Sequence, residues 1–283
     1  MKGTVAIIGA AGKMGTRLSN NLMKNPDYSV LYCEKNPAGI ERLREKGLAV
    51  AEAREAVPAA DFVIMAVPDA LLSAVSAEIR ELSKPGSTVI LLDPAAPTAG
   101  EVSVKEGVAY VVCHPCHPPL FGKQDSDEAR ADFFGGVTAK QDIVIALMAG
   151  GESSFAKAED LCRAMFAPVV KAHRITVEQM AILEPAMAEV VAATAAVLMK
   201  EALEAAVAKG VPREAATSFM MGHAQIPLAI VFGAIGSPFS DAAKIAVEYG
   251  RRKIIRKDWK KVFETKSVKA CIREMLHSKG KKP

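Results

Sequence analysis

The stretch "TVAIIGAAGKMG" (Thr4–Gly15) decides the fold of this 283-residue chain. An apolar run that can be buried on both faces of a sheet ends at a glycine triplet, Gly9, Gly12 and Gly15. Glycines at this spacing allow a tight turn, bring backbone N–H groups close to a pyrophosphate, and let the helix pack closely on the strand. The pattern predicts a strand, a phosphate-binding loop and a helix, which is how a dinucleotide-binding domain begins.

An acidic residue follows where such a domain needs one, at the end of the second apolar run, "YSVLYCE" (Tyr28–Glu34). A carboxylate there would bind the ribose hydroxyls of NAD and repel the phosphate of NADP, although Lys35 beside it weakens that preference. The later loop "AVPDALL" (Ala66–Leu72) would lie near the nicotinamide, or be a plain strand-to-helix turn. A nucleotide-like fold that binds nothing is the alternative to the whole assignment. The residues expected to contact NAD are Gly9, Ala11, Gly12, Lys13, Met14, Glu34, Val67 and Pro68.

Short apolar runs alternate with helical patterns through the first half of the chain. Strand, helix and strand in repetition predict a parallel sheet with right-handed crossovers. The runs are short and apolar throughout, as in strands that are buried on both faces. The expected strands are Thr4–Gly9, Tyr28–Glu34, Asp61–Val67, Ser87–Asp93, Ala109–His114 and Asp142–Ala149.

The pattern changes after about His173 and is almost wholly helical from Thr176, which forms a plausible capping box with Gln179. The expected architecture is therefore α/β: a doubly wound Rossmann domain over residues 1–175, followed by an all-α domain over residues 176–283. The Met- and Ala-rich helices of the second domain predict core packing and a homodimer interface.

Bulk composition excludes several classes of protein. The net charge of +4 is too small to indicate nucleic-acid binding, although it suits an anionic small substrate. The first residues, "MKGTVAIIG", are too short for a signal peptide, and we expect no later run to approach a membrane span. The five cysteines are scattered, so they are read as free thiols of a cytoplasmic protein.

The stretch "VVCHPCHPPLF" (Val111–Phe121) follows the fifth expected strand. Its Cys pair has no second ligand pair elsewhere, which disfavours structural zinc, and its prolines disfavour the helix that follows a thioredoxin-like redox pair. We expect a rigid loop at the carboxyl edge of the sheet, where ligands bind in this class of fold. There His114 and His117 would act as metal ligands or as general acid or base; otherwise one caps a turn and the cysteines belong to the core.

A second unusual stretch, "ILEPAMAEVVAAT" (Ile182–Thr194), places Pro185 inside a helical pattern. Interior proline costs roughly 3 kcal/mol, so it predicts a bend. Glu184 at this bend needs a partner, which could be a metal, an arginine or a substrate proton; alternatively it caps a helix that starts at Pro185. His223 is read as a core histidine.

Four stretches together resemble one family. They are "GAAGKMGTRLSNNL" (Gly9–Leu22), "HPCHPPLF" (His114–Phe121), "ILEPAMAE" (Ile182–Glu189) and "PREAATSFMMGHAQIPLAIVFG" (Pro212–Gly233). The chain is similar over nearly its whole length to the D-apionate oxidoisomerases, a group with a phosphogluconate-dehydrogenase-like C-terminal domain. The resemblance implies NAD-dependent oxidation of D-apionate, a branched sugar acid, coupled to hydroxymethyl migration, with 3-oxo-isoapionate as product.

Such a rearrangement builds charge on an alkoxide beside a 2-oxo acid, which a divalent metal such as Zn or Mg would stabilise as a Lewis acid. We expect His114 and Glu184 to supply the metal ligands, or to act as acid and base if no metal is used. The stretch Thr176–Thr194 contains no Lys, Asn or Gly. It therefore departs from the catalytic helix of the β-hydroxyacid dehydrogenases.

Two other functions stay open from the sequence. One is an ordinary NAD(P)-dependent dehydrogenase of another hydroxy acid, without carbon migration. The other is a dinucleotide-sensing protein without turnover.

Overall fold

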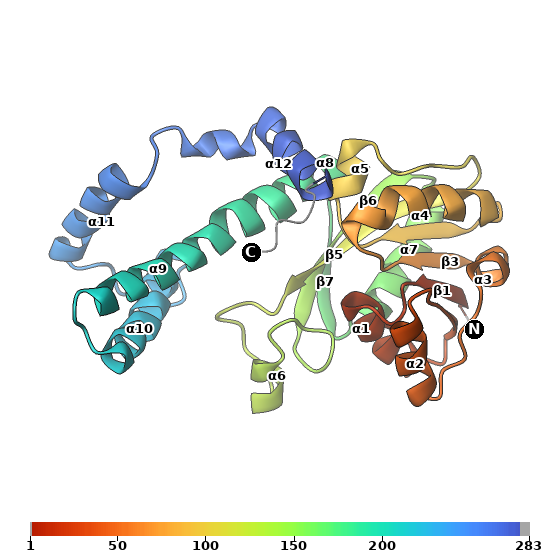
Figure 1. Ribbon diagram of the computed structural model, residues 1–283, viewed down its shortest axis with the longest axis horizontal. Coiled ribbons are helices and arrows are strands. Elements are labelled where there is room, and N and C mark those ends of the chain that lie inside the picture. The colour runs from red at the N-terminus through yellow and green to blue at the C-terminus, as the bar shows by residue number, and fades with distance from the viewer. Residues whose placement is uncertain (1, 278–283) are drawn as a thin grey trace. The chain divides into compact units, whose positions relative to one another are not determined.

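The computed structural model describes residues 2–277, shown in Figure 1. The chain forms two compact units. Of the described residues, the first contains 2–184 together with 269–277, and the second runs from Pro185 to Val268. These units are defined by packing. The division into functional domains at residue 175 stays a prediction.

The first unit is built on a seven-stranded sheet with the strand order β2-β1-β3-β4-β5-β6-β7. All neighbouring strands are parallel except β5 and β6, which are antiparallel. The doubly wound order that was expected is therefore confirmed, with one reversal. The strands are β1 (Gly3–Ile8), β2 (Tyr28–Cys33), β3 (Phe62–Met65), β4 (Thr88–Leu91), β5 (Ala109–His117), β6 (Gln141–Ala149) and β7 (Val169–Arg174).

Helices cover both faces of this sheet (Figure 1). On one face α1 packs against α7, and on the other α4 contacts both α3 and α5. The central strands β3 and β4 are buried at every position, as a sheet covered on both sides requires. The helices are α1 (Lys13–Leu22), α2 (Pro37–Glu45), α3 (Ala53–Ala59), α4 (Asp69–Leu82), α5 (Ala95–Ala99), α6 (Asp127–Ala131) and α7 (Glu152–Met165).

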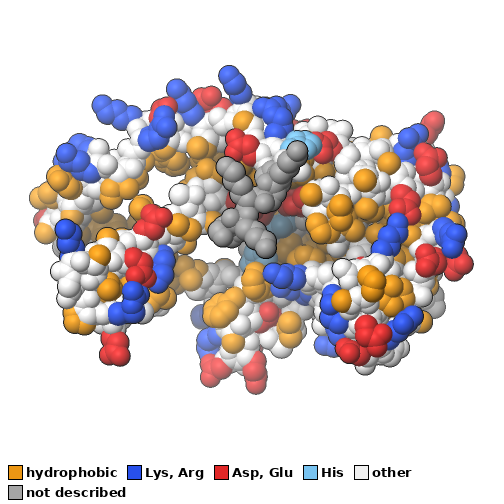
Figure 2. Space-filling view, viewed as in Figure 1, with side chains coloured by type: hydrophobic (Ala, Val, Ile, Leu, Met, Phe, Trp, Pro, Cys, Tyr) orange, Lys and Arg blue, Asp and Glu red, His pale blue; other side chains and the backbone are white. Residues whose placement is uncertain are grey.

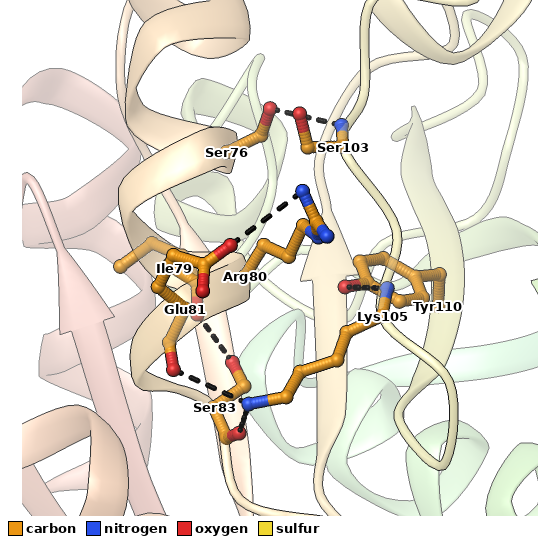
Figure 3. A network of polar contacts seen from close by, with 8 residues as sticks. All are labelled: Ser76, Ile79, Arg80, Glu81, Ser83, Ser103, Lys105 and Tyr110. Atoms are coloured by element: carbon orange, nitrogen blue, oxygen red, sulfur yellow. Dashed lines mark hydrogen bonds and ion pairs between the residues drawn. The ribbon is translucent and has the colours of Figure 1, made fainter.

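A polar network closes the carboxyl end of α4 against the segment before β5 (Figure 3). The Lys105 ammonium donates to the carbonyls of Glu81 and Ser83 at 3.2 and 2.7 Å, which satisfies acceptors that a helix end leaves free. The Lys105 backbone N–H donates to the Tyr110 hydroxyl at 3.0 Å. This network fixes α4, whose other end lies at the cofactor edge of the sheet.

Strand β5 is longer than expected and continues through Pro115 to His117. A register shift between Pro115 and His117 interrupts its pairing with β6, and proline is tolerated at such irregularities. His117 has a φ of 61°, in the left-handed region. The predicted loop therefore begins only after His117.

A continuous helix runs from Val177 to Ala208 through α8 (Val177–Ala181), the π-helix η1 (Ile182–Ala193) and α9 (Thr194–Ala208). The predicted capping box of Thr176 and Gln179 is present at its start. The helix is long and apolar enough to cross a membrane by length and composition, and 11% of its most apolar stretch is buried. The expectation that no run approaches a membrane span is therefore wrong on length and composition.

The second unit continues with α10 (Arg213–Val231), α11 (Asp241–Ile254) and the short 3₁₀-helix η2 (Trp259–Phe263), before α12 (Thr265–His277). Helices α9 and α10 pack on each other. Much of the apolar surface of this unit is exposed, as the apolar side chains in Figure 2 show. The exposed residues include Val197, Leu198, Phe219, Met221, Ile226, Val231, Phe232, Ile245, Val247, Tyr249 and Ile254.

Candidate functional site

The glycine loop forms the tight turn that its sequence predicts. Gly9 has a φ of 83°, and the N–H groups of Gly9 and Ala10 both donate to the Cys33 carbonyl, at 2.9 and 3.1 Å. The Gly12 N–H donates to the Gly9 carbonyl at 3.1 Å. Gly12 then leads directly into α1, so the first free N–H groups of that helix point out of the loop, as phosphate binding requires.

Glu34 closes this loop from the next strand. One carboxylate oxygen accepts the Ala11 N–H at 3.1 Å, and the other accepts the N–H groups of Lys35 and Asn36 at 3.0 and 2.9 Å. The Lys35 ammonium pairs with Glu78 at 2.9 Å. The positive charge beside Glu34 is therefore already neutralised within the protein.

A cavity of 560 Å³ lies beside this loop. The predicted cofactor residues Gly9, Gly12, Glu34, Val67 and Pro68 line it. Its size and its apolar walls suit the adenosine half of a dinucleotide.

A second cavity of 390 Å³ adjoins the first through the shared residues Gly12, Val67 and Pro68. Lys13 and Met14 line it from the start of α1, and His114 lines it from β5. Ala11 lines neither cavity, because it is buried beneath the loop. The structure thus brings one predicted catalytic histidine to the predicted cofactor residues.

His114 is held in one tautomer by the backbone. Its Nδ1 lies 2.8 Å from the Leu92 carbonyl oxygen, which can only accept, so Nδ1 carries the proton. The neutral ring therefore presents a lone pair at Nε2. That atom lies 3.5 Å from Oε2 of Glu184, and both side chains are largely buried. A lone pair and a carboxylate oxygen at this separation can share a proton or a cation.

His117 is fixed in a similar way but is directed elsewhere. Its Nδ1 lies 2.9 Å from the Phe134 carbonyl oxygen, and its ring meets the His114 ring edge-to-face with centroids 6.1 Å apart. It lines neither of the two cavities. His117 therefore neighbours the site, and its predicted catalytic role stays a prediction.

Glu184 does not cap a helix that starts at Pro185. It lies inside the continuous helix, in the π-helical segment η1 that also contains Pro185. A proline lacks the N–H that an α-helical turn needs, and π-helical turns are rare elements that occur at functional sites. The structure accommodates the interior proline in a widened helical segment, and the bend itself stays a prediction.

The two cysteines of this stretch lie in different environments. Cys113 is fully buried and Cys116 is exposed, and both are free thiols. Although part of the Cys116 side chain is exposed, the protein around it desolvates the thiol and raises its pKa to about 11, which keeps it protonated near neutral pH. Within residues 2–277, no three His, Cys, Asp or Glu side chains converge as a metal site. His223 is exposed rather than in the core, and it stacks on Phe219 with ring centroids 3.8 Å apart.

Sequence reasoning missed two carboxylates that line the second cavity, Asp69 and Asp93. Burial raises the pKa of both carboxyl groups. The negative charge of Asp93 raises the pKa of Asp69 further, and that of Glu184 raises the pKa of Asp93. Asp93 also accepts the Ala95 N–H at 2.7 Å. The signal was present, because each aspartate follows the end of a parallel strand, where ligands bind.

Comparisons with known proteins agree with this arrangement. Residues 4–97 match the family described as NADP oxidoreductase coenzyme F420-dependent, and residues 122–276 match the phosphogluconate dehydrogenase (decarboxylating) C-terminal family. The D-apionate oxidoisomerases of Cupriavidus necator and Rhizobium rhizogenes are 42% and 43% identical to this chain. The first alignment covers 97% of this chain and 100% of the relative, and the second covers 96% and 98%.

Solved structures extend the comparison. A Cupriavidus necator protein described as a semialdehyde dehydrogenase NAD-binding protein, solved in complex with calcium and NAD, has a TM-score of 0.94 at 42% identity. The match covers 97% of this chain and 100% of that one. A ketol-acid reductoisomerase from an uncultured archean shares only the fold, with a TM-score of 0.69 at 20% identity over 97% and 82% of the two chains. By its full-length relatives, the chain is an oxidoreductase that belongs to the D-apionate oxidoisomerase family.

Proposed function

We propose that this protein is an NAD-dependent oxidoisomerase that converts D-apionate into 3-oxo-isoapionate. The observation that carries the proposal is the pair of His114 Nε2 and Glu184 Oε2, 3.5 Å apart, with His114 in the cavity that also holds the cofactor residues Lys13 and Val67. The choice of D-apionate as the substrate is supported by the relatives named D-apionate oxidoisomerase, which align with nearly the full chain.

NAD is the proposed cofactor, and it would accept the hydride from the oxidised carbon. The N–H groups at the start of α1 and the Glu34 carboxylate suit its pyrophosphate and its adenosine ribose. The NAD complex of the similar structure supports this choice. Gly9, Gly12, Val67 and Pro68 would form the walls of the site, with Ala11 behind them.

A divalent metal fits the donor pair in part. The Nε2 lone pair and the Oε2 oxygen are close enough to be two ligands of one ion, and a nitrogen–oxygen pair suits Zn better than Mg. No third protein ligand lies beside them in residues 2–277, which leaves positions for substrate oxygens. The ion would supply Lewis-acid stabilisation of an alkoxide. The similar structure was solved with calcium, which supports a cation in this fold.

The residues of the chain can also move the protons themselves. His114, locked with its proton on Nδ1, would accept the proton of the C2 hydroxyl at Nε2 as that carbon is oxidised. The Glu184 carboxylate would stabilise the resulting imidazolium. The C3 hydroxyl of the resulting 2-oxo acid would then lose its proton and become the C3 carbonyl as the bond from C3 to the hydroxymethyl carbon breaks. That carbon would bond to C2, and the C2 oxygen would take up the proton that the C3 hydroxyl released.

The test is NADH absorbance with purified protein, NAD and D-apionate, with and without EDTA, followed by NMR of the product. Formation of NADH and of the rearranged 3-oxo acid is the expected result, and loss of turnover with EDTA supports the metal. NADH with an unrearranged 2-oxo acid would instead make the protein a plain dehydrogenase. NADH binding without turnover on any sugar acid would leave a dinucleotide sensor.

Glu34 sets the preference for NAD in this proposal. Glu34→Ser removes three hydrogen bonds to N–H groups and the negative charge that would face a 2′-phosphate. We expect the Kd of NADH to rise about tenfold, since a hydrogen bond to a charged group is worth roughly 1.5–3 kcal/mol, while the Kd of NADPH falls. Fluorescence titration with both nucleotides checks this. An unchanged ratio of the two affinities would contradict the role.

A homodimer in the cytoplasm completes the proposal, with no nucleic acid and no membrane as partner. The exposed apolar residues of the second unit are many for a free surface, and a second copy would cover them. Light scattering after gel filtration should therefore give twice the chain mass of 30.0 kDa without detergent. Phe219→Glu, at a residue 67% exposed on α10, is expected to shift the protein towards the monomer. Protein that is soluble only in detergent would contradict this and favour a membrane.

A further inference from the structure

Asp69 is the partly buried carboxylate of the first unit that has no partner. It accepts no hydrogen bond and forms no ion pair with any residue in the range 2–277. Comparable carboxylates in the unit are satisfied. Asp61 accepts the Thr4 N–H at 2.9 Å, and Asp132 accepts three N–H groups at 3.0, 3.0 and 3.1 Å.

The unpartnered carboxylate of Asp69 lines the second cavity. Asp69 is the first residue of α4 and follows the strand-end loop that contains Val67 and Pro68. It lines the cavity together with His114, the residue at the centre of the proposed chemistry. A partly desolvated carboxylate without donors is costly, so a group that enters the cavity and donates hydrogen bonds would be favoured there.

The charge of the cavity decides which donors fit. Asp69 and Asp93 are two carboxylates, and among the described residues Lys13 is the single Lys or Arg that lines the cavity with them. The carboxylate of a sugar acid would be repelled by the two aspartates, whereas its hydroxyl groups would be attracted. A bound sugar acid would therefore turn its hydroxyl-bearing end towards Asp69.

We propose that Asp69 is a specificity-determining residue whose carboxylate accepts hydrogen bonds from the hydroxymethyl hydroxyls of the branched acid. The assignment rests on the proposed function. It gives the site a means to prefer a polyhydroxylated acid over one that has methyl groups in the same places. A site built to accept hydroxyl donors discriminates strongly against an analogue that lacks them, because its own polar group is then left unpaired.

The test compares wild-type protein, Asp69→Ala and Asp69→Asn. The substrates and inhibitors are D-apionate and the two analogues in which one hydroxymethyl group is a methyl group. We expect Asp69→Ala to lower kcat/KM for D-apionate by about 10–100-fold. Asp69→Asn keeps an acceptor oxygen and should lose less. For the analogue that lacks the contacted hydroxyl, the inhibition constant should change less than about threefold between wild type and Asp69→Ala.

Asp241→Ala is the matched control. Asp241 is also the first residue of a helix, α11, but its side chain is 95% exposed. Both variants lose a negative charge at a helix start, so any effect of the helix dipole is shared. The control should keep kcat/KM for D-apionate within about twofold.

Three outcomes overturn the assignment. If Asp69→Ala weakens D-apionate and both analogues equally, the carboxylate does not read a hydroxymethyl hydroxyl. If its main effect is a rise in the Kd of NADH measured without substrate, the partner is a hydroxyl of the cofactor. If wild-type protein forms no NADH with D-apionate, the proposed function itself fails and the assignment falls with it.

Discussion

His114→Ala is expected to lower kcat by about 10²–10⁴-fold and to leave the Kd of NADH unchanged. Among residues 2–277 the ring is the only imidazole that lines the cavity at the cofactor residues, and its Nε2 lies 3.5 Å from Oε2 of Glu184. Alanine removes the proton acceptor if His114 acts as a general base, and it removes a metal ligand if His114 binds a divalent ion. Steady-state kinetics and nucleotide titration measure the two quantities separately.

The double variant His114→Ala/Glu184→Gln tests whether the two side chains act as a unit. Groups that act as a unit give losses that do not add, so the double variant should be about as slow as His114→Ala alone. His173→Ala is the matched control, since His173 also pairs with a carboxylate, Asp142 at 2.8 Å, but lines neither cavity. It should keep kcat within about threefold. A His114→Ala protein that is as active as the control would remove His114 from the mechanism.

Gly15→Ala is expected to destabilise the first unit by about 3 kcal/mol, which lowers its Tm by roughly 10 °C. A methyl group on Gly15 would overlap the Gly9 carbonyl oxygen and lie 2.8 Å from two backbone atoms of Ala10. Backbone atoms cannot rotate away as a flexible side chain can. The loop must therefore open, and the N–H groups that would bind pyrophosphate move with it. The affinity for NADH should fall at least tenfold together with the stability.

Gly151→Ala separates this effect from the general consequences of replacing glycine. Gly151 precedes α7 with a φ of −119°, and a methyl group there would meet nothing within 4 Å. Its unfolding free energy should change by no more than about 1 kcal/mol. Differential scanning calorimetry of the two variants and of the wild type measures the Tm and the unfolding free energy of each. Equal stability of both variants would mean that the loop tolerates a side chain at Gly15.

The fold was largely predictable because its signals are local. The glycine loop and six of the strands could be identified from short patterns, and each was found close to its expected place. The seventh strand, Val169–Arg174, was missed because it lies at the sheet edge and has no fully buried position, so its sequence "VVKAHR" lacks a buried run. The reversal of β6 was also invisible, because an apolar strand reads the same in either direction.

The candidate site was predictable only in part, because it depends on where distant segments meet. His114 and Glu184 were each chosen from local chemistry, yet their separation of 3.5 Å depends on the path of the helix that begins at Val177. The π-helical turns around Pro185 could not be derived from a proline that more often bends or ends a helix. The two cavity aspartates, by contrast, could have been found from their places after strand ends.

The chain returns to its first unit at Lys269, so this unit can be completed only late in synthesis. Residues 269–277 belong to that unit, where Ile272 and Leu276 are buried and His277 lies 2.9 Å from Glu101, which precedes it by 176 positions. A growing polypeptide emerges from the ribosome amino end first, and such a distant contact cannot form until His277 has emerged. The dinucleotide-binding unit therefore cannot mature as an early, separate product of translation. It is complete only after α12 has been made.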